Sequence, residues 1–411
     1  MILVTHPFGN ANVRAVLNAL DHADLLAKFV TTLGWSTSSP FVHAMPENLR
    51  AQMARRAYDL PHYKIKTLPA REIVRLLAEK FGLRWLTRHE TGWASIDRIW
   101  NNLDQVTADY LRQNHERLKI RGVYAYEDCA ERSFEGAREL GLRRIYDLPI
   151  AYWETAQRLL REEARRYPQW EPTLGGTRDS DEKLARKTRE LELADIVVCP
   201  SAFVLDSLPE NARLSKRCVV APFGSPAEID NGSYRTHRTY SGRVRFLFAG
   251  ALTQRKGLAD LFAAMKLVGS RDAELVVMGS LILPMSFYRN EFTDFVYEPP
   301  RAHAAVLHLM RSCDVLVLPS IVEGRALVQQ EAMACGLPLV ATRNAGGEDL
   351  IVEGKTGFLV PTGAPAAIAE KIVWFLQNRA QLPAMSAAAR AKAAELTWPD
   401  YGAKILHAIR D

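Results

Sequence analysis

Short apolar segments alternate with amphipathic segments along most of the chain. In the first half, apolar runs of strand length occur at 2–5, 122–126, 144–147, 194–199 and 217–221, and helical patterns cover 46–118, 130–140 and 154–193. The alternation then restarts, with strands expected at 245–249, 273–278, 315–318 and 337–341 and helices at 258–268, 301–312, 326–335, 365–378 and 383–395. Short apolar strands separated by amphipathic helices are typical of parallel sheets that are covered on both faces. The pattern therefore predicts an α/β protein.

A polar and irregular stretch at 225–242 separates the two series of elements. Its composition is that of a domain linker, and a chain of 411 residues is too long for one typical core. We therefore predict a Rossmann-like N-terminal domain at 1–224 and a Rossmann-like C-terminal domain at 243–395, which face each other across a cleft. A final helix within 396–411 is expected to pack back toward the N-terminal domain.

Loops that follow the strands are the expected ligand sites, because open parallel sheets bind ligands beyond the carboxyl ends of their strands. The loops concerned are 6–12, 250–257, 279–283 and 320–325. His6 lies directly after the first strand and is a candidate catalytic group. A structural histidine whose hydrogen bonds are satisfied is the alternative.

Glu331 is a candidate for binding a ligand. In a helix over 326–335, with about 100° per residue, it lies in the middle of an apolar stripe, while Gln329 and Gln330 point elsewhere. The stripe comprises Leu327, Val328, Ala334 and Cys335. A carboxylate buried there needs hydrogen-bond donors. Two ribose hydroxyls would supply them, and an arginine or backbone N–H groups would do so in a structural pair.

Glu323 is a second candidate. It follows Ser320 by three residues, so a capping box at the start of a helix is one interpretation. Glycine follows, and a glycine lets the backbone approach a ligand closely. The start of the helix would then favour a phosphate or another anion. The amides concerned belong to Gly324, Arg325, Ala326 and Leu327.

A further anion site is expected after the first strand of the second series. The loop that begins at Gly250 contains Arg255 and Lys256, and two adjacent cations suit a diphosphate. Gly279 begins the corresponding loop after the next strand. Because the cations lie at the same predicted sheet edge as Glu323, the two sites support each other.

The segment from about 194 to 363 resembles the retaining glycosyltransferases of family 4, which have the two-domain GT-B architecture. Three features carry most of the resemblance. They are Glu323 and Glu331 with seven residues between them, the sequence EAMACGLP at 331–338, and GKTGFLVP at 354–361, with shorter matches at 194–201 and 222–224. The match is specific in the C-terminal half and looser before it.

The resemblance implies transfer of a sugar from a UDP- or GDP-linked donor with retention of the anomeric configuration, without a metal or another cofactor. Glu331 would bind the ribose and Glu323 the sugar hydroxyls. Lys256 would bind the diphosphate, which Gly9 and Asn10 would approach from the other domain. Cations and helix dipoles would stabilise the leaving diphosphate.

Two positions near the expected phosphate site depart from the family pattern. Ala251 stands where relatives often have an arginine, so Arg255 would have to compensate. Arg325 stands where relatives often have phenylalanine. It would alter the donor pocket or reach the acceptor.

A third departure lies in the N-terminal half. Many relatives have a histidine after the strand that ends at Tyr126, whereas this chain has Glu127 and Asp128. These acids would contact the donor sugar or the acceptor and take part in catalysis, or they would cap the helix that begins near Ala130.

Cysteine usage and hydropathy exclude several classes of protein. The five cysteines are odd in number and widely spaced, so we expect free thiols and neither a disulfide framework nor a metal site. No uninterrupted apolar run is long enough to span a membrane. The first residues lack the pattern of a secretory signal. We therefore predict a cytoplasmic protein.

The net charge of +6 permits an anionic partner. Ten basic and four acidic residues lie between Arg50 and Glu90, interleaved with aromatic residues. A solvated helical face is the ordinary explanation, and peripheral contact with anionic lipids at the inner membrane face is the functional one. No nucleic-acid partner is expected.

Three functions follow from these features. The favoured one is a hexosyltransferase-like enzyme that acts on a carbohydrate or lipid-linked acceptor in polysaccharide biosynthesis. The second is a nucleotide-sugar epimerase of the same architecture, which needs no acceptor. The third is a non-catalytic protein that binds nucleotide sugars.

Overall fold

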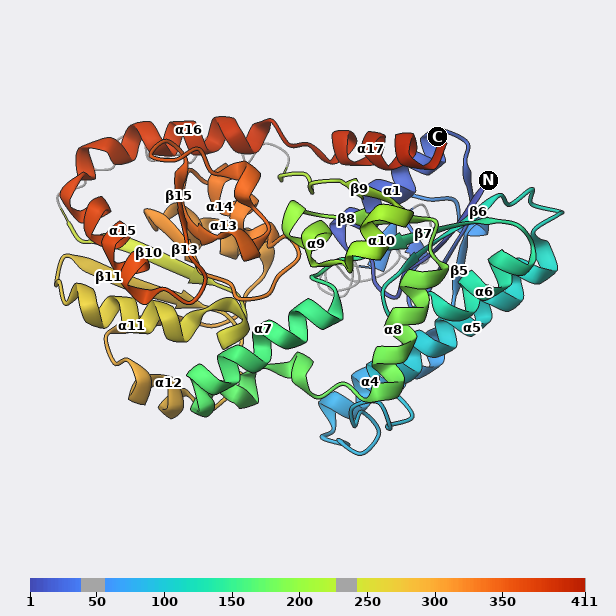
Figure 1. Ribbon diagram of the computed structural model, residues 1–411, viewed down its shortest axis with the longest axis horizontal. Helices are drawn as coiled ribbons and strands as arrows, with labels where there is room; N and C mark the ends of the chain where they lie inside the picture. The colour runs from blue at the N-terminus through green and yellow to red at the C-terminus, as the bar shows by residue number, and fades with distance from the viewer. Residues whose placement is uncertain (38–55, 227–241, 411) are drawn as a thin grey trace.

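The computed structural model describes residues 1–37, 56–226 and 242–410, in which two α/β units lie side by side along the long axis (Figure 1). Each unit is built on one parallel sheet, so the predicted α/β class and the GT-B architecture are confirmed. Most of the linker predicted at 225–242 lies outside the described residues, and so do residues 50–55 of the basic segment.

The N-terminal sheet has seven parallel strands in the order β5-β2-β1-β6-β7-β8-β9. The strands are β1 (Ile2–Thr5), β2 (Leu26–Thr31), β5 (Ile65–Thr67), β6 (Gly122–Tyr126), β7 (Arg143–Asp147), β8 (Ile196–Cys199) and β9 (Arg217–Val220), with a separate short pair, β3 (Trp35–Ser36) and β4 (Ala57–Tyr58). The helices are α1 (Ala11–His22), α4 (Pro69–Lys80), α5 (Ile96–Asn114), α6 (Glu131–Glu139), α7 (Trp153–Arg166), α8 (Asp181–Leu193), α9 (Ala202–Ser207) and α10 (Glu210–Ser215). Side chains of α5, α6 and α8 pack on one face of the sheet, and those of α1 pack on the other.

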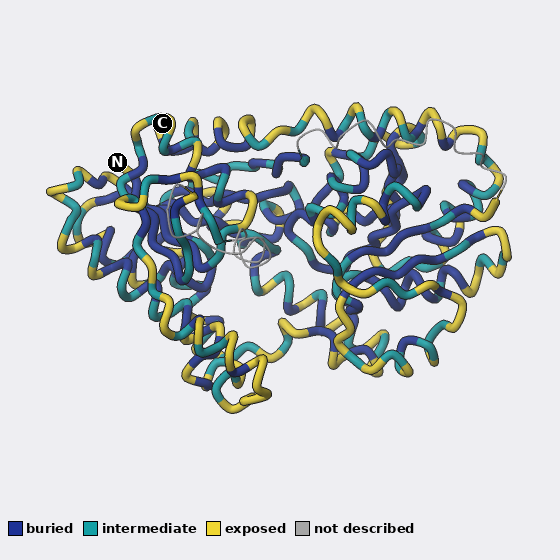
Figure 2. Tube along the Cα trace, turned by 180° about the vertical axis from the view of Figure 1, so that it is seen from behind, coloured by how far each residue is buried: buried dark blue, intermediate teal, exposed yellow. Residues whose placement is uncertain are grey.

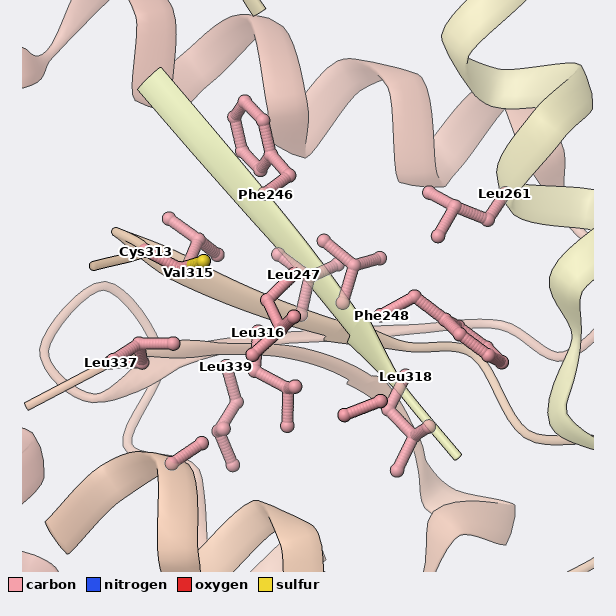
Figure 3. Packing of buried hydrophobic residues seen from close by; sticks show 14 of the residues in the cluster. Phe246, Leu247, Phe248, Leu261, Cys313, Val315, Leu316, Leu318, Leu337 and Leu339 are labelled. Atoms are coloured by element: carbon pink, nitrogen blue, oxygen red, sulfur yellow. The ribbon is translucent and has the colours of Figure 1, made fainter. Parts of the chain in front are cut away.

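The C-terminal sheet has six parallel strands in the order β12-β11-β10-β13-β14-β15. They are β10 (Val244–Ala249), β11 (Ala273–Met278), β12 (Phe295–Glu298), β13 (Val315–Leu318), β14 (Leu339–Thr342) and β15 (Gly357–Val360). The helices are α11 (Leu258–Val268), α12 (Met285–Glu291), α13 (His303–Arg311), α14 (Leu327–Ala334), α15 (Pro365–Gln377), α16 (Leu382–Ala394) and α17 (Trp398–Arg410). The central strands are buried on both faces, so their side chains form near-continuous apolar runs (Figures 2 and 3).

Two segments cross between the units. Trp170, in a 3-10 helix that follows α7, is fully buried in the core of the C-terminal unit, with its ring centroid 5.0 Å from that of Phe287. In the opposite direction, α17 packs against α1, and Tyr401 and Ile405 join the core of the N-terminal unit. The two units are therefore tied together by buried side chains at two places.

Several elements differ from the predicted ones. The region 46–118 was expected to be mostly helical, yet it also contains β4 and β5, and the strands β2, β12 and β15 were not predicted. β5 and β12 are short edge strands, whose patterns are weak. The charged region 154–193 forms two helices, because Pro168 and Pro172 interrupt the helical pattern.

Candidate active site

A pocket of about 610 Å³ lies between the two units. The N-terminal unit contributes the start of α1, the end of β6 and the loops after β7 and β9, and the C-terminal unit contributes the loop after β10 and the starts of α13 and α14. Eight of the candidate residues line it, namely Asn10, Gly250, Lys256, Glu323, Arg325, Ala326, Leu327 and Glu331. The other candidates are not among the described residues that line it; they are His6, Gly9, Glu127, Asp128, Arg255, Gly279 and Gly324.

Glu323 forms the polar centre of the pocket together with two cations. Its carboxylate is 2.5 Å from Lys256 Nζ and 3.1 Å from Arg255 Nη1. Burial alone would raise the pKa of Glu323, but the ion pairs with Lys256 and Arg255 outweigh burial and hold this pKa below its ordinary value. The carboxylate therefore stays ionised, and the two cations can be shared with a second anion.

The glycines of the C-terminal loops allow those loops to pack against each other. A Cβ on Gly250 would lie 2.7 Å from Lys256 Cδ, and a Cβ on Gly279 would lie 1.7 Å from the Gly250 carbonyl oxygen. Both glycines have φ near +150°, which side chains rarely allow. The two positions thus let the Lys256 side chain lie flat along the loop and hold its ammonium at Glu323.

Gly324 faces the other unit of the protein. A Cβ on this residue would lie 1.6 Å from the Pro149 carbonyl oxygen, and Ser201 Oγ donates a 2.7 Å hydrogen bond to the Gly324 carbonyl oxygen. We expected this glycine to let the backbone approach a ligand. The structure corrects that reason, because the space left by the missing side chain is filled by the N-terminal unit.

The helix after Glu323 begins later than the capping interpretation requires. α14 starts at Leu327, and its N-cap residue Ala326 provides no side-chain cap. The Ser320 hydroxyl has no hydrogen-bond partner among the described residues, so a capping box with Glu323 is excluded. The Ala326 amide donates a hydrogen bond to the Ala345 carbonyl and is therefore occupied. The first amides of α14 at the pocket are those of Leu327 and Val328, both of which line it.

Glu331 lies on the pocket wall and not in the core. Its side chain is 21% exposed and lies 3.0 Å from His303 Nε2, with Leu327 and Val328 on the same wall. We expected Gln329 to point away from the buried face, but it is fully buried, and its Nε2 donates a 2.9 Å hydrogen bond to the Ala345 carbonyl. The first half of the apolar stripe, Leu327 and Val328, therefore faces the cleft, while Cys335 packs in the core, and Glu331 is open to a ligand.

Arg325 is a structural residue in this fold. Its side chain is fully buried, its Nη1 is 2.6 Å from Asp349 Oδ1, and its Nε donates 3.0 Å to Gln330 Oε1. These partners hold the guanidinium inside the C-terminal unit, at the wall of the pocket that Arg325 lines. Its effect on the donor pocket or the acceptor stays a prediction.

Glu127 and Asp128 pair with cations of α8. Lys187 Nζ is 2.8 Å from Glu127 and 2.9 Å from Asp128, and Arg186 Nη2 is 3.2 Å from Asp128. The α6 start is held instead by Glu190, which accepts from the backbone of Asp128 and Ala130. Neither acid caps α6 in the part of the chain that the structure describes, because α8 supplies their partners. A contact with the donor sugar or the acceptor stays a prediction.

His6 is buried beneath the pocket. Its Nδ1 accepts a 2.9 Å hydrogen bond from the Phe8 amide, and its ring packs on Tyr126 at 4.3 Å. Burial lowers the pKa of His6 to about 3, so the ring is neutral. Tyr126 lies between His6 and the pocket. Gly9 packs on Tyr58, with its Cβ position 2.5 Å from the hydroxyl.

Eleven lining residues were not among the candidates, and five of them have polar or aromatic side chains. They are Asn12, Tyr126, Phe223, Arg301 and His303. Arg301 lies two residues before α13, and His303 is the first residue of α13. Because β12 was not predicted, the loop between β12 and this helix was not recognised as one that follows a strand. The pair of prolines at 299–300 was the available signal, since it separates a strand from a helix.

A buried carboxyl lies next to the pocket in the N-terminal unit. Asn12 Nδ2 is 3.5 Å from Asp147 Oδ2, and Asp147 is fully buried at the end of β7. Burial raises the pKa of Asp147 to about 7. This group therefore titrates in the physiological range, one residue away from the cleft.

Among the described residues, one group brings potential metal ligands together: His89, Glu90 and Asp179, whose ligand atoms lie within 4.8 Å of one another. The group lies outside the cleft pocket. Lys183 Nζ is 3.0 Å from Asp179 and places a positive charge beside the carboxylates. No described helix is long and apolar enough to cross a membrane.

Solved structures define the class of the fold. Sucrose-phosphate synthase from Thermosynechococcus elongatus matches with a TM-score of 0.67 and 16% identity, over 100% of this chain and 98% of that one. HepE from Anabaena, solved in complex with UDP, matches with a TM-score of 0.62 and 14% identity, over 100% and 99%. At such identities the match shows the fold, which is GT-B.

The family follows from the second half of the chain. Residues 234–392 match the family model described as glycosyl transferases group 1, and this range includes Lys256, Glu323 and Glu331. Residues 234–392 are therefore similar to the group 1 glycosyltransferases, and the resemblance expected from the motifs is confirmed.

Curated relatives agree with the family but are matched only in part. An uncharacterized glycosyltransferase of Methanocaldococcus jannaschii is 29% identical over 189 residues, which are 45% of this chain and 50% of the relative. A D-inositol 3-phosphate glycosyltransferase of Paenarthrobacter aurescens is 31% identical over 172 residues, 38% of this chain and 42% of the relative. The chain spans about half the length of these relatives, or less.

Proposed function

We propose that this chain is a retaining glycosyltransferase. It would move a sugar from a UDP- or GDP-linked donor to a carbohydrate or lipid-linked acceptor, without a metal or another cofactor. The observation that carries the proposal is a pocket between the two units that Lys256, Glu323 and Glu331 line, with Arg255 paired to Glu323 beside it. The HepE structures of this fold that hold UDP and UDP-glucose support a nucleotide-sugar donor.

The charges of the pocket fit the two ends of such a donor. As a diphosphate enters, Lys256 and Arg255 would turn part of their hydrogen bonding from Glu323 to the phosphate oxygens. Glu323 would then accept from a hydroxyl of the sugar. The first amides of α14 would add their dipole to the stabilisation of the leaving diphosphate.

Glu331 would bind the ribose through its two hydroxyls. Its side chain is partly exposed on the pocket wall, and among the described residues its one polar partner is His303, at 3.0 Å from one carboxylate oxygen, which leaves the other oxygen for a ligand. Replacing Glu331 with Gln should weaken nucleotide binding. Glu291→Gln, a half-exposed glutamate on α12, is the matched control.

The carboxylates of the pocket also bear on stereochemistry. Of the described residues that line it, only Glu323 and Glu331 carry a carboxylate, and both are assigned to the donor. A double displacement needs a further carboxylate as nucleophile on the opposite face of the sugar. We therefore propose that the acceptor hydroxyl attacks from the face that the diphosphate leaves, and that a diphosphate oxygen takes its proton.

The test begins with the nucleotide. A thermal-shift panel of UDP, GDP, ADP and CMP should show one nucleoside diphosphate that raises the melting temperature, since a ligand of the folded state stabilises it. The matching nucleotide sugar is then incubated with acceptors, and NMR gives the anomeric configuration of the product. Inversion would refute retention. Conversion of the donor to an epimer would indicate the epimerase, and binding without turnover would indicate a non-catalytic protein.

A peripheral contact with an anionic membrane is a second part of the proposal, and it concerns α4 and the turn after it. α4 buries a carboxylate, Glu72, which pairs with Arg75, and it exposes apolar side chains. In the part of the chain that the structure describes, nine of the seventeen exposed large hydrophobic side chains lie between 63 and 96. Phe81 is 67% exposed and Trp85 is 66% exposed, and exposed apolar patches of this kind mark interaction surfaces.

Exposed Lys80, Arg84 and Arg88 lie in the same segment, so the charge suits anionic lipids. Flotation with phosphatidylcholine vesicles that contain phosphatidylglycerol tests the contact. A Phe81→Ser, Trp85→Ser variant should lose binding, while Leu214→Ser, which alters an 81% exposed leucine elsewhere in the N-terminal unit, should keep it. Equal binding of the two variants would contradict the proposal.

A further inference from the structure

A second pocket, of about 890 Å³, lies within the N-terminal unit, among α4, α5, α6 and α8. Arginines from all four helices converge on it. They are Arg71 of α4, Arg98 of α5, Arg132 of α6, and Arg186 and Arg189 of α8. A solvated basic helix would place its charges along one element, whereas here four elements direct guanidinium groups toward one space.

The carboxylates of this pocket do not cancel the cations. Asp104 accepts hydrogen bonds from the backbone amides of Arg132 and Ser133, at 2.7 and 2.9 Å, so its charge is directed to the start of α6. Glu131 and Glu182 are the other two acids. Arg186 and Arg189 pair with carboxylates outside the lining, Asp128 and Glu192, so the lining arginines without an ion pair among the described residues are Arg71, Arg98 and Arg132.

Several of the guanidinium groups have bonding capacity to spare. No hydrogen bond or ion pair is found for the side chains of Arg98 and Arg132 within residues 1–37, 56–226 and 242–410. Arg186 is only 13% exposed, and its Nε is buried without a hydrogen-bond acceptor in that part of the chain. Arg71 is held in place, with its Nε 3.2 Å from Asn102 Oδ1 and its guanidinium over the Trp93 ring at 4.6 Å.

The pocket lies close to both surfaces that the proposed function uses. Tyr126 lines the cleft pocket and Glu131 lines the arginine pocket, and five residues of chain span at most about 17 Å. The ring centroids of Trp100 and Tyr126 lie 6.0 Å apart, and Trp100 directly precedes Asn101 and Asn102, which line the arginine pocket. On the opposite side, Arg71 belongs to α4, which carries the exposed apolar side chains.

From this arrangement we infer that the arginine pocket binds the phosphate or pyrophosphate group of the acceptor, which places the rest of the acceptor at the cleft. The inference rests on the proposed transferase function. Guanidinium groups bind phosphate oxygens in bidentate fashion, and several from different directions can enclose a pyrophosphate. The same chemistry serves a soluble phosphorylated acceptor and a lipid phosphate whose chain stays at α4.

The test compares a variant that lacks the two arginines without side-chain partners, Arg98 and Arg132, with a control variant that lacks two arginines elsewhere. Arg98→Gln, Arg132→Gln is the test variant, and Arg161→Gln, Arg165→Gln on α7 is the control, because it removes the same charge from exposed positions without side-chain partners among the described residues. One arm measures inorganic pyrophosphate by calorimetry in saturating nucleoside diphosphate. The other arm measures flotation with phosphatidylcholine vesicles with and without phosphatidic acid.

In the first arm we expect the test variant to bind pyrophosphate about tenfold more weakly than the control. Weakening in the pyrophosphate arm supports a soluble phosphorylated acceptor, and weakening only with phosphatidic acid supports a lipid phosphate. Equal binding of test and control in both arms overturns the inference. Nucleotide affinity, measured separately, should be the same in the wild type, the test variant and the control. If none of the three binds a nucleotide, the proposed function is refuted, and the pyrophosphate measurement still tests the arginine pocket independently.

Discussion

Adding one methyl group at Gly324 should open the cleft. The Cβ of Gly324→Ala would lie 1.6 Å from the Pro149 carbonyl oxygen, whereas real Cβ contacts are essentially never closer than 3.0 Å. The loops of the two units must therefore separate by about 1.4 Å, or the variant must accept strain. The φ of Gly324 is outside the left-handed region, so the backbone itself allows alanine. The perturbation is confined to the contact between the units.

Overpacking of this kind costs about 1–3 kcal/mol. We expect that cost to fall on the closed arrangement, because the open one relieves the contact. Glu331 and Lys256 both belong to the C-terminal unit, so nucleotide affinity should change little. Transfer should fall by roughly one to two orders of magnitude, since each 1.4 kcal/mol is a factor of ten.

The measurements are small-angle scattering, nucleotide calorimetry and turnover. Gly175→Ala is the control, because a Cβ there meets nothing within 4 Å and no positive φ is involved. A larger radius of gyration and slower transfer with unchanged nucleotide affinity would agree with the reasoning. Scattering and turnover equal to those of Gly175→Ala would refute it.

Three further predictions follow from single side chains. Lys256→Ala should weaken binding of the nucleoside diphosphate by about 1.5–3 kcal/mol, measured by calorimetry against Lys266→Ala on the exposed side of α11; equal affinities would contradict the phosphate role. Trp170→Ala should lower the free energy of unfolding by about 3–5 kcal/mol in urea titrations, and a loss as small as that of an exposed tryptophan would show that the crossing segment is not part of the core. Asp147→Asn should be nearly neutral below about pH 4, where the carboxyl is protonated in both the folded and the unfolded protein, and should gain stability by up to about 4 kcal/mol at pH 8, where the wild type buries a charge. The sign follows because the folded pKa is raised, so the wild type loses stability as the pH rises toward 7; the same pH dependence in both proteins would show that another group titrates.

Much of the fold was accessible from sequence because buried parallel strands give near-continuous apolar runs. β10, β11 and β13 have such runs and were predicted, whereas the edge strands β5 and β12 did not stand out. The periodicity of α14 was also predicted, but not which side of it faces the core. Gln329 and Gln330 are buried, with their amide nitrogens bonded to backbone carbonyls and the Gln330 oxygen to Arg325. Such partners come from distant loops that a sequence pattern does not reveal.

Part of the candidate site was likewise predictable from sequence, and part of it was not. Lys256, Glu323 and Glu331 were predicted from motifs, and the structure brings them to one pocket. Glu127 and Asp128 follow a strand at the cleft edge, as a catalytic pair would, yet α8 neutralises them with Lys187 and Arg186. The contact between Gly324 and Pro149 could not be predicted, because it depends on how the two units are placed relative to each other.

The crossing segments have a consequence for protein engineering. Trp170 completes a core that otherwise belongs to the matched range 234–392, and α17 completes a core that belongs to the other unit. A chimaera made by joining the two sheets of different relatives at the linker would leave both cores mismatched. A functional exchange of donor halves would have to carry the turn around Trp170 with the C-terminal sheet and leave α17 with the N-terminal sheet, so the units of recombination are interleaved along the chain.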